Sequence, residues 1–373
     1  MSPATHISWF EHVGLDDRAH VGGKGGSLGE LERAGIAVPP GFVVRTGAFE
    51  RFVEGLERGS PVRARVEALD CEDLEAVMAC SRALRTRLEE TPLPAEVLDE
   101  LTSAHAQLCR DEPGSAVAVR SSATTEDAID ASFAGLQDTY LWVLGAEAML
   151  QRVRSCWASL YSAESISYRR TRRFPESGVA MAVVVQRMVD ARTAGVMFTR
   201  SPTTGDRSVV TIEGAWGLGS AVVGGEVTPD RWVVGKITGE ISVRDISDKA
   251  IQHAPAGTEA VRGTAGGHAG SSALAGEARQ GGGIETVSVA QELRRSPCLS
   301  DAEIQALREI ARQVERHYGR AQDIEWAIDR RTGEILLLQS RPETVWSVRE
   351  SAPAARPAEN PLAHLMSVFG GRR

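Results

Sequence analysis

The hydrophobic positions of this chain repeat at helical spacing in some stretches and form short apolar runs in others. Helical spacing dominates residues 48–112, which are rich in Glu, Arg, Ala and Leu, and residues 146–170, so we expect mostly helices there. The short apolar runs predict strands at 42–44, 117–120, 139–143, 181–188, 195–199, 209–212 and 231–234. We expect the last four runs to lie in one sheet.

The C-terminal third has the clearest boundaries between elements. Helical spacing resumes at Asp301–Tyr318, where Ser300 is the expected N-cap and Glu303 completes a capping box. Two strands, 323–328 and 334–340, follow with a short turn between them. The pattern therefore predicts a helix followed by an antiparallel hairpin.

Two stretches lack periodicity. Residues 254–283 shift sharply to Gly, Ala, Ser and Thr, a composition that predicts a flexible loop because it buries little apolar surface. An Ala/Pro tail at 347–373 ends with an apolar patch at 362–369. That patch is either a docking peptide or a frayed helix on the chain's own surface.

Composition narrows the classes of protein that remain. A length of 373 residues with 42% hydrophobic content predicts two or three domains, and 42 basic against 50 acidic residues argue against a nucleic-acid-binding surface. No apolar stretch has the length of a membrane helix, and the N-terminus does not have the pattern of a signal peptide. Five scattered cysteines indicate neither a zinc site nor a disulfide framework, so we expect a cytoplasmic protein.

The chain has only three lysines, and one of them, Lys24, lies inside the glycine cluster 22–26. We expect a glycine loop there, followed by a helix at 27–34. Glycines let backbone N–H groups approach phosphate, and the start of a helix adds positive charge. The order of residues is not that of a P-loop. The sequence predicts an anion cradle, with a flexible surface turn as the alternative.

Arg120 is expected to end a strand and to face a hydroxyl-rich loop at 121–124. A guanidinium group grips phosphate oxygens through two parallel hydrogen bonds, and small hydroxyls add donors without bulk. The alternative is a structural ion pair with Glu126 or Asp127. Arg120 is therefore a candidate phosphate ligand.

The hairpin at 323–340 carries a candidate metal site. Strand alternation places Glu325 on one face with Asp323 and Ala327, and Gln339 on one face with Arg341. A carboxylate and an amide oxygen across a hairpin are ligands of the kind that Mg²⁺ shares with nucleotide phosphates. The alternative is an Arg–Glu pair on a solvent face. None of the eight histidines has the surroundings of a nucleophile.

Together these segments resemble a known family, the nucleotide-binding N-terminal domain of phosphoenolpyruvate synthase, pyruvate phosphate dikinase and rifampin phosphotransferase. The resemblance extends over almost the whole chain. The matching segments are VGGKGGSLGEL at 21–31, VPPGFVV at 38–44, VAVRSSATTED at 117–127, ASFAGLQDTYL at 131–141, QRMV at 186–189, AGVMFTRSP at 194–202, EGAWGLGSAVVGGEVTPD at 213–230, HYGRAQDIEWAID at 317–329 and LLLQSRPETVWS at 336–347.

The resemblance implies an α+β ATP-grasp fold, in which two lobes with mostly antiparallel sheets clamp ATP. The lobes would be residues 1–190 and 191–346, followed by the tail at 347–373. Lys24, Arg120 and Arg341 would contact the phosphates and do the catalytic work of neutralising charge. The other implied contacts are Gly135, Thr139 and Gln186 in the nucleotide pocket, and Glu325 and Gln339 as ligands of Mg²⁺ or Mn²⁺.

Enzymes of this family pass a pyrophosphoryl group from ATP to a histidine on a swivelling domain, with release of AMP and phosphate. The sequence ends soon after residues 341–344 without such a domain, so we expect a separate histidine-bearing subunit. This arrangement resembles the ATP-binding subunit of phenylphosphate synthase, which makes phenol the first expected acceptor and pyruvate the alternative. The alternative from a different functional class is a catalytically silent module that senses nucleotide.

Overall fold

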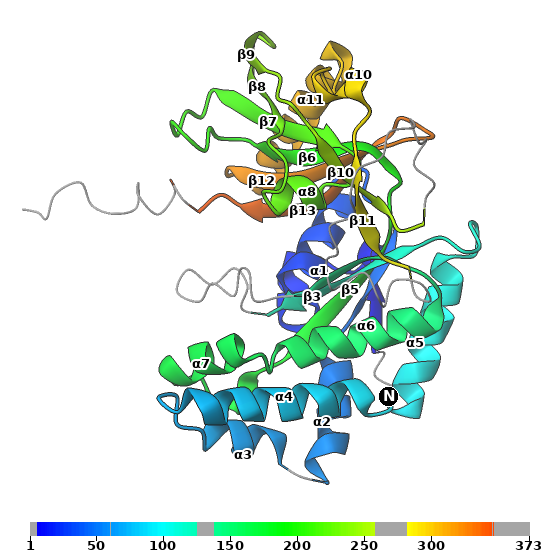
Figure 1. The fold of residues 1–373 in the computed structure, drawn as a ribbon, viewed down its shortest axis with the longest axis vertical. Helices are drawn as coiled ribbons and strands as arrows, with labels where there is room; N and C mark the ends of the chain where they lie inside the picture. Colours follow the sequence, from blue (N-terminus) through cyan, green and yellow to red (C-terminus); the bar gives the residue numbers. More distant parts are fainter. Residues whose placement is uncertain (1–5, 60, 125–137, 258–281, 345, 347–373) are drawn as a thin grey trace, which may run out of the picture.

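The computed structural model describes residues 6–59, 61–124, 138–257, 282–344 and 346. Its helices and strands form two bodies, each built on an antiparallel sheet (Figure 1). The first sheet has five strands in the order β1-β2-β5-β3-β4, and the second has six in the order β13-β12-β6-β7-β8-β9. A two-stranded sheet, β10-β11, lies beside them. The expected α+β class is confirmed.

The first body has helices on both faces of its sheet, with α1 on one face and α2 and α6 on the other. Its strands are β1 Ile7–Trp9, β2 Gly41–Val44, β3 Val117–Ala123, β4 Thr139–Val143 and β5 Met181–Arg187. Its helices are α1 Arg18–Arg33, α2 Thr46–Glu57, α3 Val62–Glu67, α4 Leu74–Glu90, α5 Ala95–Leu108, α6 Ala146–Ser159 and α7 Ala163–Thr171, with short 3₁₀ turns at Phe10–His12, Leu15–Asp17 and Glu176–Gly178. The helical spacing predicted for 48–112 and 146–170 is confirmed.

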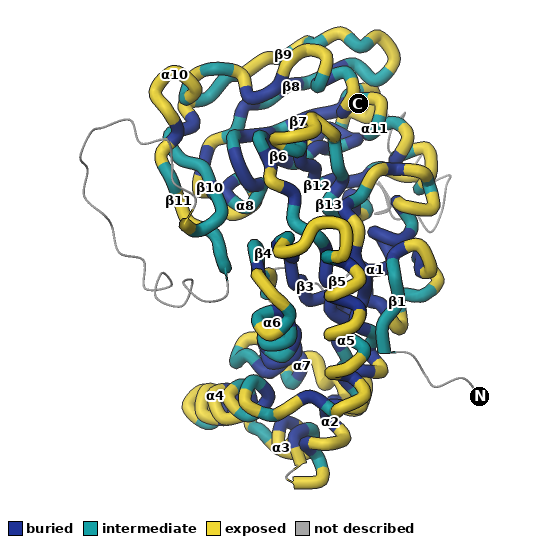
Figure 2. The backbone as a smooth tube through the Cα atoms, turned by 90° about the vertical axis from the view of Figure 1, so that its right-hand side faces the viewer, coloured by how far each residue is buried: buried dark blue, intermediate teal, exposed yellow. Residues whose placement is uncertain are grey.

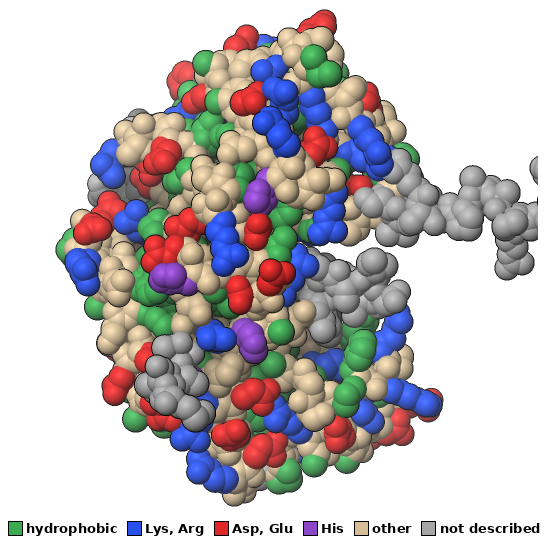
Figure 3. All heavy atoms as spheres, turned by 180° about the vertical axis from the view of Figure 1, so that it is seen from behind, with side chains coloured by type: hydrophobic (Ala, Val, Ile, Leu, Met, Phe, Trp, Pro, Cys, Tyr) green, Lys and Arg blue, Asp and Glu red, His purple; other side chains and the backbone are tan. Residues whose placement is uncertain are grey.

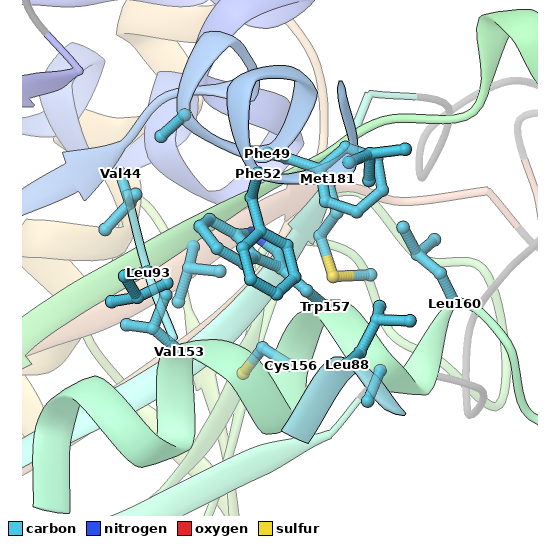
Figure 4. Packing of buried hydrophobic residues seen from close by; sticks show 14 of the residues in the cluster. Val44, Phe49, Phe52, Leu88, Leu93, Val153, Cys156, Trp157, Leu160 and Met181 are labelled. Atoms are coloured by element: carbon cyan, nitrogen blue, oxygen red, sulfur yellow. The ribbon is translucent and has the colours of Figure 1, made fainter. Parts of the chain in front are cut away.

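The core of the first body is formed where α2 and α6 cover one face of the sheet and α4 packs on α6 (Figure 4). Trp157 is fully buried, with its ring centroid 5.1 Å from that of Phe52 and 5.9 Å from that of Phe49. Leu88 and Met181 close the same cluster. Burial of these large side chains fixes the helices to the sheet, because each contributes about 1.5–3 kcal/mol of transfer free energy.

The second body carries fewer helices. Its strands are β6 Ala191–Phe198, β7 Val209–Trp216, β8 Asp230–Gly235, β9 Ile241–Asp245, β12 Gln322–Asp329 and β13 Ile335–Pro342, and the small sheet adds β10 Ile251–Pro255 and β11 Ile284–Ser288. The helices are α8 Ser220–Val223, α10 Gln291–Arg294 and α11 Asp301–Tyr318. The capping box of α11 is confirmed, because Ser300 Oγ accepts from the Glu303 N–H and Glu303 Oε2 accepts from the Ser300 N–H.

One predicted sheet assignment is wrong. Strand β5 (the run at 181–188) does not join the other three runs but pairs with β2 and β3 in the first sheet, with Val185 opposite both Phe42 and Val119. The chain crosses to the second sheet between Arg187 and Ala191. Strands of similar apolar composition give no local signal of which sheet they join, since pairing is decided by tertiary packing.

The glycine cluster lies inside helix α1 rather than in a loop before a helix. The helix is broken at Gly22, whose φ of 70° is the left-handed conformation that favours glycine. A Cβ on Gly22 would lie 2.2 Å from the Ser122 carbonyl oxygen, and one on Gly25 would lie 2.9 Å from Val43. Glycine is required because α1 packs directly against the sheet. The flexible-surface-turn alternative is wrong, since Gly22, Gly23, Gly25 and Gly26 are buried.

The segment expected to be a flexible loop, 254–283, has ordered ends. Residues 254 and 255 belong to β10, and Gly282 forms a β-bridge with Val143 of the first body. The Gly283 N–H donates to the Trp142 carbonyl at 2.9 Å. The β10–β11 pair thus reaches from the second body to β4 (Figure 2). Residues 258–281 and the tail at 347–373, with its expected docking peptide, lie outside the described residues.

Two surface properties bear on the expectations from composition. Among the described helices, none combines the length and apolarity that a bilayer crossing needs. On the face seen in Figure 3, acidic and basic side chains are interspersed over most of the surface.

Candidate functional site

A cavity of about 810 Å³ lies between the two sheets and is lined from both. Every predicted site residue that the structure describes lines this cavity, although they come from opposite ends of the chain. They are Lys24, Arg120, Thr139, Gln186, Glu325, Gln339 and Arg341. The remaining predicted contact, Gly135, lies outside the described residues.

Arg120 links the two bodies. It lies within β3, which continues through Ala123, so it does not end its strand as expected. Its Nη2 donates to Gln339 Oε1 at 2.6 Å and to Glu325 Oε2 at 3.3 Å, and its Nη1 donates to the Leu338 carbonyl at 2.9 Å. The side chain is 90% buried between these partners. The alternative partners, residues 126 and 127, lie outside the described residues.

Glu325 and Gln339 lie directly opposite each other in the β12–β13 register. Because both side-chain oxygens accept from the same Arg120 nitrogen, they converge on one point inside the cavity. The alternative, an Arg–Glu pair on a solvent face, is wrong for Glu325, which pairs with the buried Arg120. Arg341 instead donates from Nε to Asp323 Oδ2, its cross-strand neighbour, at 3.4 Å. Arg341 is exposed at the cavity mouth.

These residues fit a divalent cation with phosphate ligands. A carboxylate and an amide supply the hard oxygens that Mg²⁺ prefers, and the guanidinium nitrogen of Arg120 stands in for positive charge at the point where they meet. Within the described part of the chain, no three His, Cys, Asp or Glu side chains are grouped to hold a metal. A metal at this point would therefore need oxygens from water or a ligand, as is usual for Mg²⁺ at nucleotide sites.

Asp323 lies opposite Arg341 in a partly buried position. Burial raises the pKa of this carboxyl to about 6, although the Arg341 guanidinium opposes the shift and the Glu343 carboxylate adds to it. A raised pKa means that the folded protein binds a proton at Asp323 more readily than the unfolded chain does. The charge beside Arg341, the cavity-lining residue to which Asp323 is hydrogen-bonded, thus depends on pH in the range below neutrality.

Lys24 follows the break in α1 by two residues, and Ser122 fixes that part of the helix. The Ser122 hydroxyl donates to the Val21 carbonyl at 2.9 Å and accepts from the Gly25 N–H at 3.2 Å. Ser121 Oγ likewise donates to the Asp138 carbonyl. The predicted hydroxyl-rich loop is therefore a strand whose first two hydroxyls bind backbone, because β3 must hold α1 and β4 in place.

Thr139 and Gln186 line the cavity from β4 and β5. Thr139 is the β-ladder partner of Arg120, and its side chain is exposed to the cavity. Gln186 is buried, and its Nε2 donates to the Pro39 carbonyl at 3.1 Å. This bond fixes the side chain at the point where the chain leaves the first sheet.

The other end of the cavity was not predicted from the sequence. Five buried apolar residues that form one cluster line it, together with Met188 and Ile284: Val189, Ala191, Ala194, Leu218 and Ala327. Beside them lie Ser220, Glu226 and His253. Ser220 and Glu226 lie in the glycine-rich segment 213–230, which is one of the segments that resemble the family, so the sequence contained a signal for their part of the site. His253 had none, since a single histidine in a strand has no distinctive pattern.

Comparison with known proteins identifies the family to which the chain belongs. The sequence profile described as "Pyruvate phosphate dikinase, AMP/ATP-binding domain" matches residues 18–360. The chain belongs to this family. The recognition made from the sequence motifs is confirmed for the phosphoenolpyruvate synthase and pyruvate phosphate dikinase nucleotide-binding domain, whereas similarity to phenylphosphate synthase is not shown.

Members of the family with curated names are similar over most of the chain. The probable phosphoenolpyruvate synthase of Methanothermobacter thermautotrophicus is 41% identical over 341 residues, which are 91% of this chain and 46% of the relative. The phosphoenolpyruvate synthase of Aeropyrum pernix is 41% identical over 95% of this chain and 44% of its own length. That of Pyrococcus furiosus is 35% identical over 95% and 45%. The chain thus spans a little under half the length of these relatives.

Proposed function

We propose that this chain binds Mg²⁺·ATP in the cavity between its two sheets, in the manner of an ATP-grasp fold, and is the nucleotide-handling part of a phosphotransferase. The observation that supports this most is convergence. Lys24 from α1, Arg120 from β3 and the Glu325, Gln339 and Arg341 group from the last hairpin line one cavity. Family membership supports the same reading.

The charged end of the cavity suits a triphosphate. Lys24, Arg120 and Arg341 are three cations around one space, and a nucleotide triphosphate brings the anionic oxygens that they would neutralise. Phosphoryl transfer depends mainly on positioning and on stabilising charge, so fixed cations in a partly buried cleft are the main catalytic contribution of this chain.

Glu325 and Gln339 would hold the metal ion, which when bound supplies positive charge to the phosphate oxygens. In the described geometry, Arg120 occupies the point where these oxygens meet. Binding of a metal there requires the guanidinium group to move, and phosphate oxygens are a suitable new partner for it. On nucleotide binding, Arg120 would thus leave the Glu325 carboxylate and the Gln339 amide and bind the phosphates instead.

The proposed transfer breaks the bond between the α and β phosphates of ATP. A histidine nitrogen takes the pyrophosphoryl group, AMP leaves, and water then removes the terminal phosphate. We propose that this histidine lies in a protein segment outside the nucleotide-binding part, on a partner subunit or elsewhere. Pyruvate is favoured as the final acceptor over phenol, because the similar proteins reported above are named phosphoenolpyruvate synthase.

Isotope transfer tests this function. The chain is incubated with Mg²⁺, ATP labelled in the β phosphate, and the histidine-bearing portion of a phosphoenolpyruvate synthase relative. The expected result is label on the added protein together with AMP. Formation of ADP, or an acceptor that takes label from γ-labelled ATP in a parallel incubation but none from β-labelled ATP, would contradict the proposed bond cleavage.

The same experiment also distinguishes the phosphotransferase from the alternative, a nucleotide-sensing module. A nucleotide-sensing module binds ATP in an equilibrium titration but labels no acceptor from any candidate partner. A chain that binds no ATP would contradict both readings.

A further inference from the structure

Three polar side chains form a connected group at the apolar end of the cavity. His253, on β10, is 94% buried, and its two ring nitrogens have different partners. Its Nδ1 lies 2.8 Å from Ser220 Oγ, and its Nε2 lies 3.2 Å from Glu226 Oε2. All three side chains line the cavity. The buried ring thus holds a hydroxyl and a carboxylate in fixed positions at the cavity wall.

Backbone contacts fix the position of this group relative to the charged end. The Leu218 N–H donates to the His253 carbonyl at 3.0 Å. A Cβ on Gly219 would lie 3.5 Å from Ala194 Cβ. Ala194 pairs with Ala327, two residues along β12 from Glu325, whereas Arg341 pairs with Asp323, two residues the other way. Since a strand rises about 3.3 Å per residue, the group lies on the far side of Glu325 from Arg341.

The arrangement is not that of a nucleophile, a base and an orienting acid. In such a relay, the acid is the buried member that orients the histidine, and the histidine activates the hydroxyl. Here the histidine is the buried member, and the Glu226 side chain is half exposed. The two outer groups face the cavity as hydrogen-bonding partners for a ligand.

We propose that Ser220 and Glu226 bind the sugar hydroxyls of the nucleotide and that His253 is their positioning residue. The inference rests on the proposed ATP-binding function. The triphosphate lies at the cationic end, and the base packs against the apolar cluster, so the polar group beside that cluster meets the sugar. A carboxylate only accepts hydrogen bonds, and a ribose hydroxyl donates one. The site therefore distinguishes ribonucleotides from deoxynucleotides.

Calorimetric titration of the full chain with Mg²⁺ and ATP, 2′-deoxy-ATP or 3′-deoxy-ATP tests this. The wild-type chain is expected to bind ATP about tenfold or more tightly than at least one of the deoxy analogues, the effect of losing one hydrogen bond to a charged group. Glu226→Ala and Ser220→Ala lower this ratio to within about threefold. His253→Phe keeps a ring in place but lowers it too. Glu334→Ala, an exposed glutamate outside the cavity, retains it.

The ratio of the affinities for ATP and its deoxy analogues distinguishes loss of a specific contact with the sugar from loss of stability. A partly unfolded protein binds all three nucleotides less well without changing this ratio. Equal binding of the three nucleotides by the wild-type chain overturns the inference and leaves ATP binding standing. Retention of the ratio by Glu226→Ala and Ser220→Ala does the same. Absence of ATP binding by the wild-type chain overturns the proposed function and the inference together.

Discussion

The two ends of the cavity are built from different kinds of residue. The charged end consists of Lys24, Arg120, Glu325, Gln339 and Arg341, and ion pairs or hydrogen bonds cross it from one sheet to the other. At the opposite end, small and branched apolar residues from β6, β12 and the segment after β7 pack together, with one polar group at the edge.

This difference has a physical consequence. The charged end exchanges partners, because its cations and oxygens can bind each other or a ligand with similar geometry. The apolar end changes little on binding, because close packing leaves it few alternatives. We therefore expect the charged end to control chemistry and metal binding, and the apolar end to control which nucleotide binds.

The largest expected effect is at Lys24. Lys24→Met removes one of the cations that line the cavity. If Lys24 binds the phosphates as proposed, label transfer from ATP is expected to fall by about 10²–10³-fold, as for loss of one stabilising donor of the transition state. The matched control is Lys236→Met. Lys236 pairs with Glu315 on the second body, away from the cavity, and its loss leaves transfer within about twofold. Equal losses in both variants would contradict a phosphate role for Lys24.

The second prediction concerns metal binding without nucleotide. Arg120→Gln frees Glu325 and Gln339 from the guanidinium group, so Mn²⁺ measured by electron paramagnetic resonance is expected to bind about tenfold more tightly than to the wild-type chain. Arg187→Gln is the control, since this arginine lines the cavity but its ion-pair partner is Glu112. Unchanged or weaker Mn²⁺ binding in Arg120→Gln would mean that Arg120 and metal do not share the site.

The third prediction uses the pKa of Asp323. The proton bound by this folded-state carboxyl stabilises the protein below pH 4, and that contribution is lost as the pH rises through about 6. Asp323→Asn mimics the protonated form. It is expected to unfold with a free energy about 1–2 kcal/mol higher than the wild-type chain at pH 7, and the difference vanishes near pH 4.

Asp329→Asn is the control of opposite sign in the same strand. Burial acts upward on the pKa of Asp329, but N–H groups of Thr332 and Arg331 lower it overall. The carboxylate therefore stabilises the fold above pH 4, so the variant is less stable than the wild-type chain at pH 7. Urea titrations at several pH values measure both. If both variants were more stable than the wild-type chain at pH 7, or both less stable, the opposite pKa shifts assigned to Asp323 and Asp329 would be wrong.

Much of the charged end was predictable from sequence because its residues carry short-range signals. A lysine among glycines is unusual, and Glu325 and Gln339 lie at matching places in two strands joined by a short turn. What the sequence did not reveal was the partner of Arg120, because a contact between residues 120 and 325 is decided by how the two sheets meet.

For the fold as well, features set by local sequence were predictable and those set by packing between distant segments were not. Helix α11 with its capping box and the last hairpin were correctly predicted, since caps and turns are local. The sheet of β5 was wrongly assigned, and the glycine cluster was expected in a loop. Both errors arose from packing between distant segments: β5 against β2 and β3, and Gly22 against Ser122. The apolar end was missed for the same reason, because alanines and valines are common in any core.

The smallest expected effect tests the apolar end alone. Leu218 is buried in the apolar cluster and lines the cavity, so Leu218→Ala removes contact area for the base while the cations stay in place. ATP affinity is expected to fall about three- to tenfold, about 1 kcal/mol of apolar burial, whereas inorganic tripolyphosphate, which has no base, binds as before. Leu293→Ala, an exposed leucine outside the cavity, should change neither affinity. If tripolyphosphate binding weakened as much as ATP binding in calorimetric titrations, the two ends would not be separable, and the division of labour between them would be wrong.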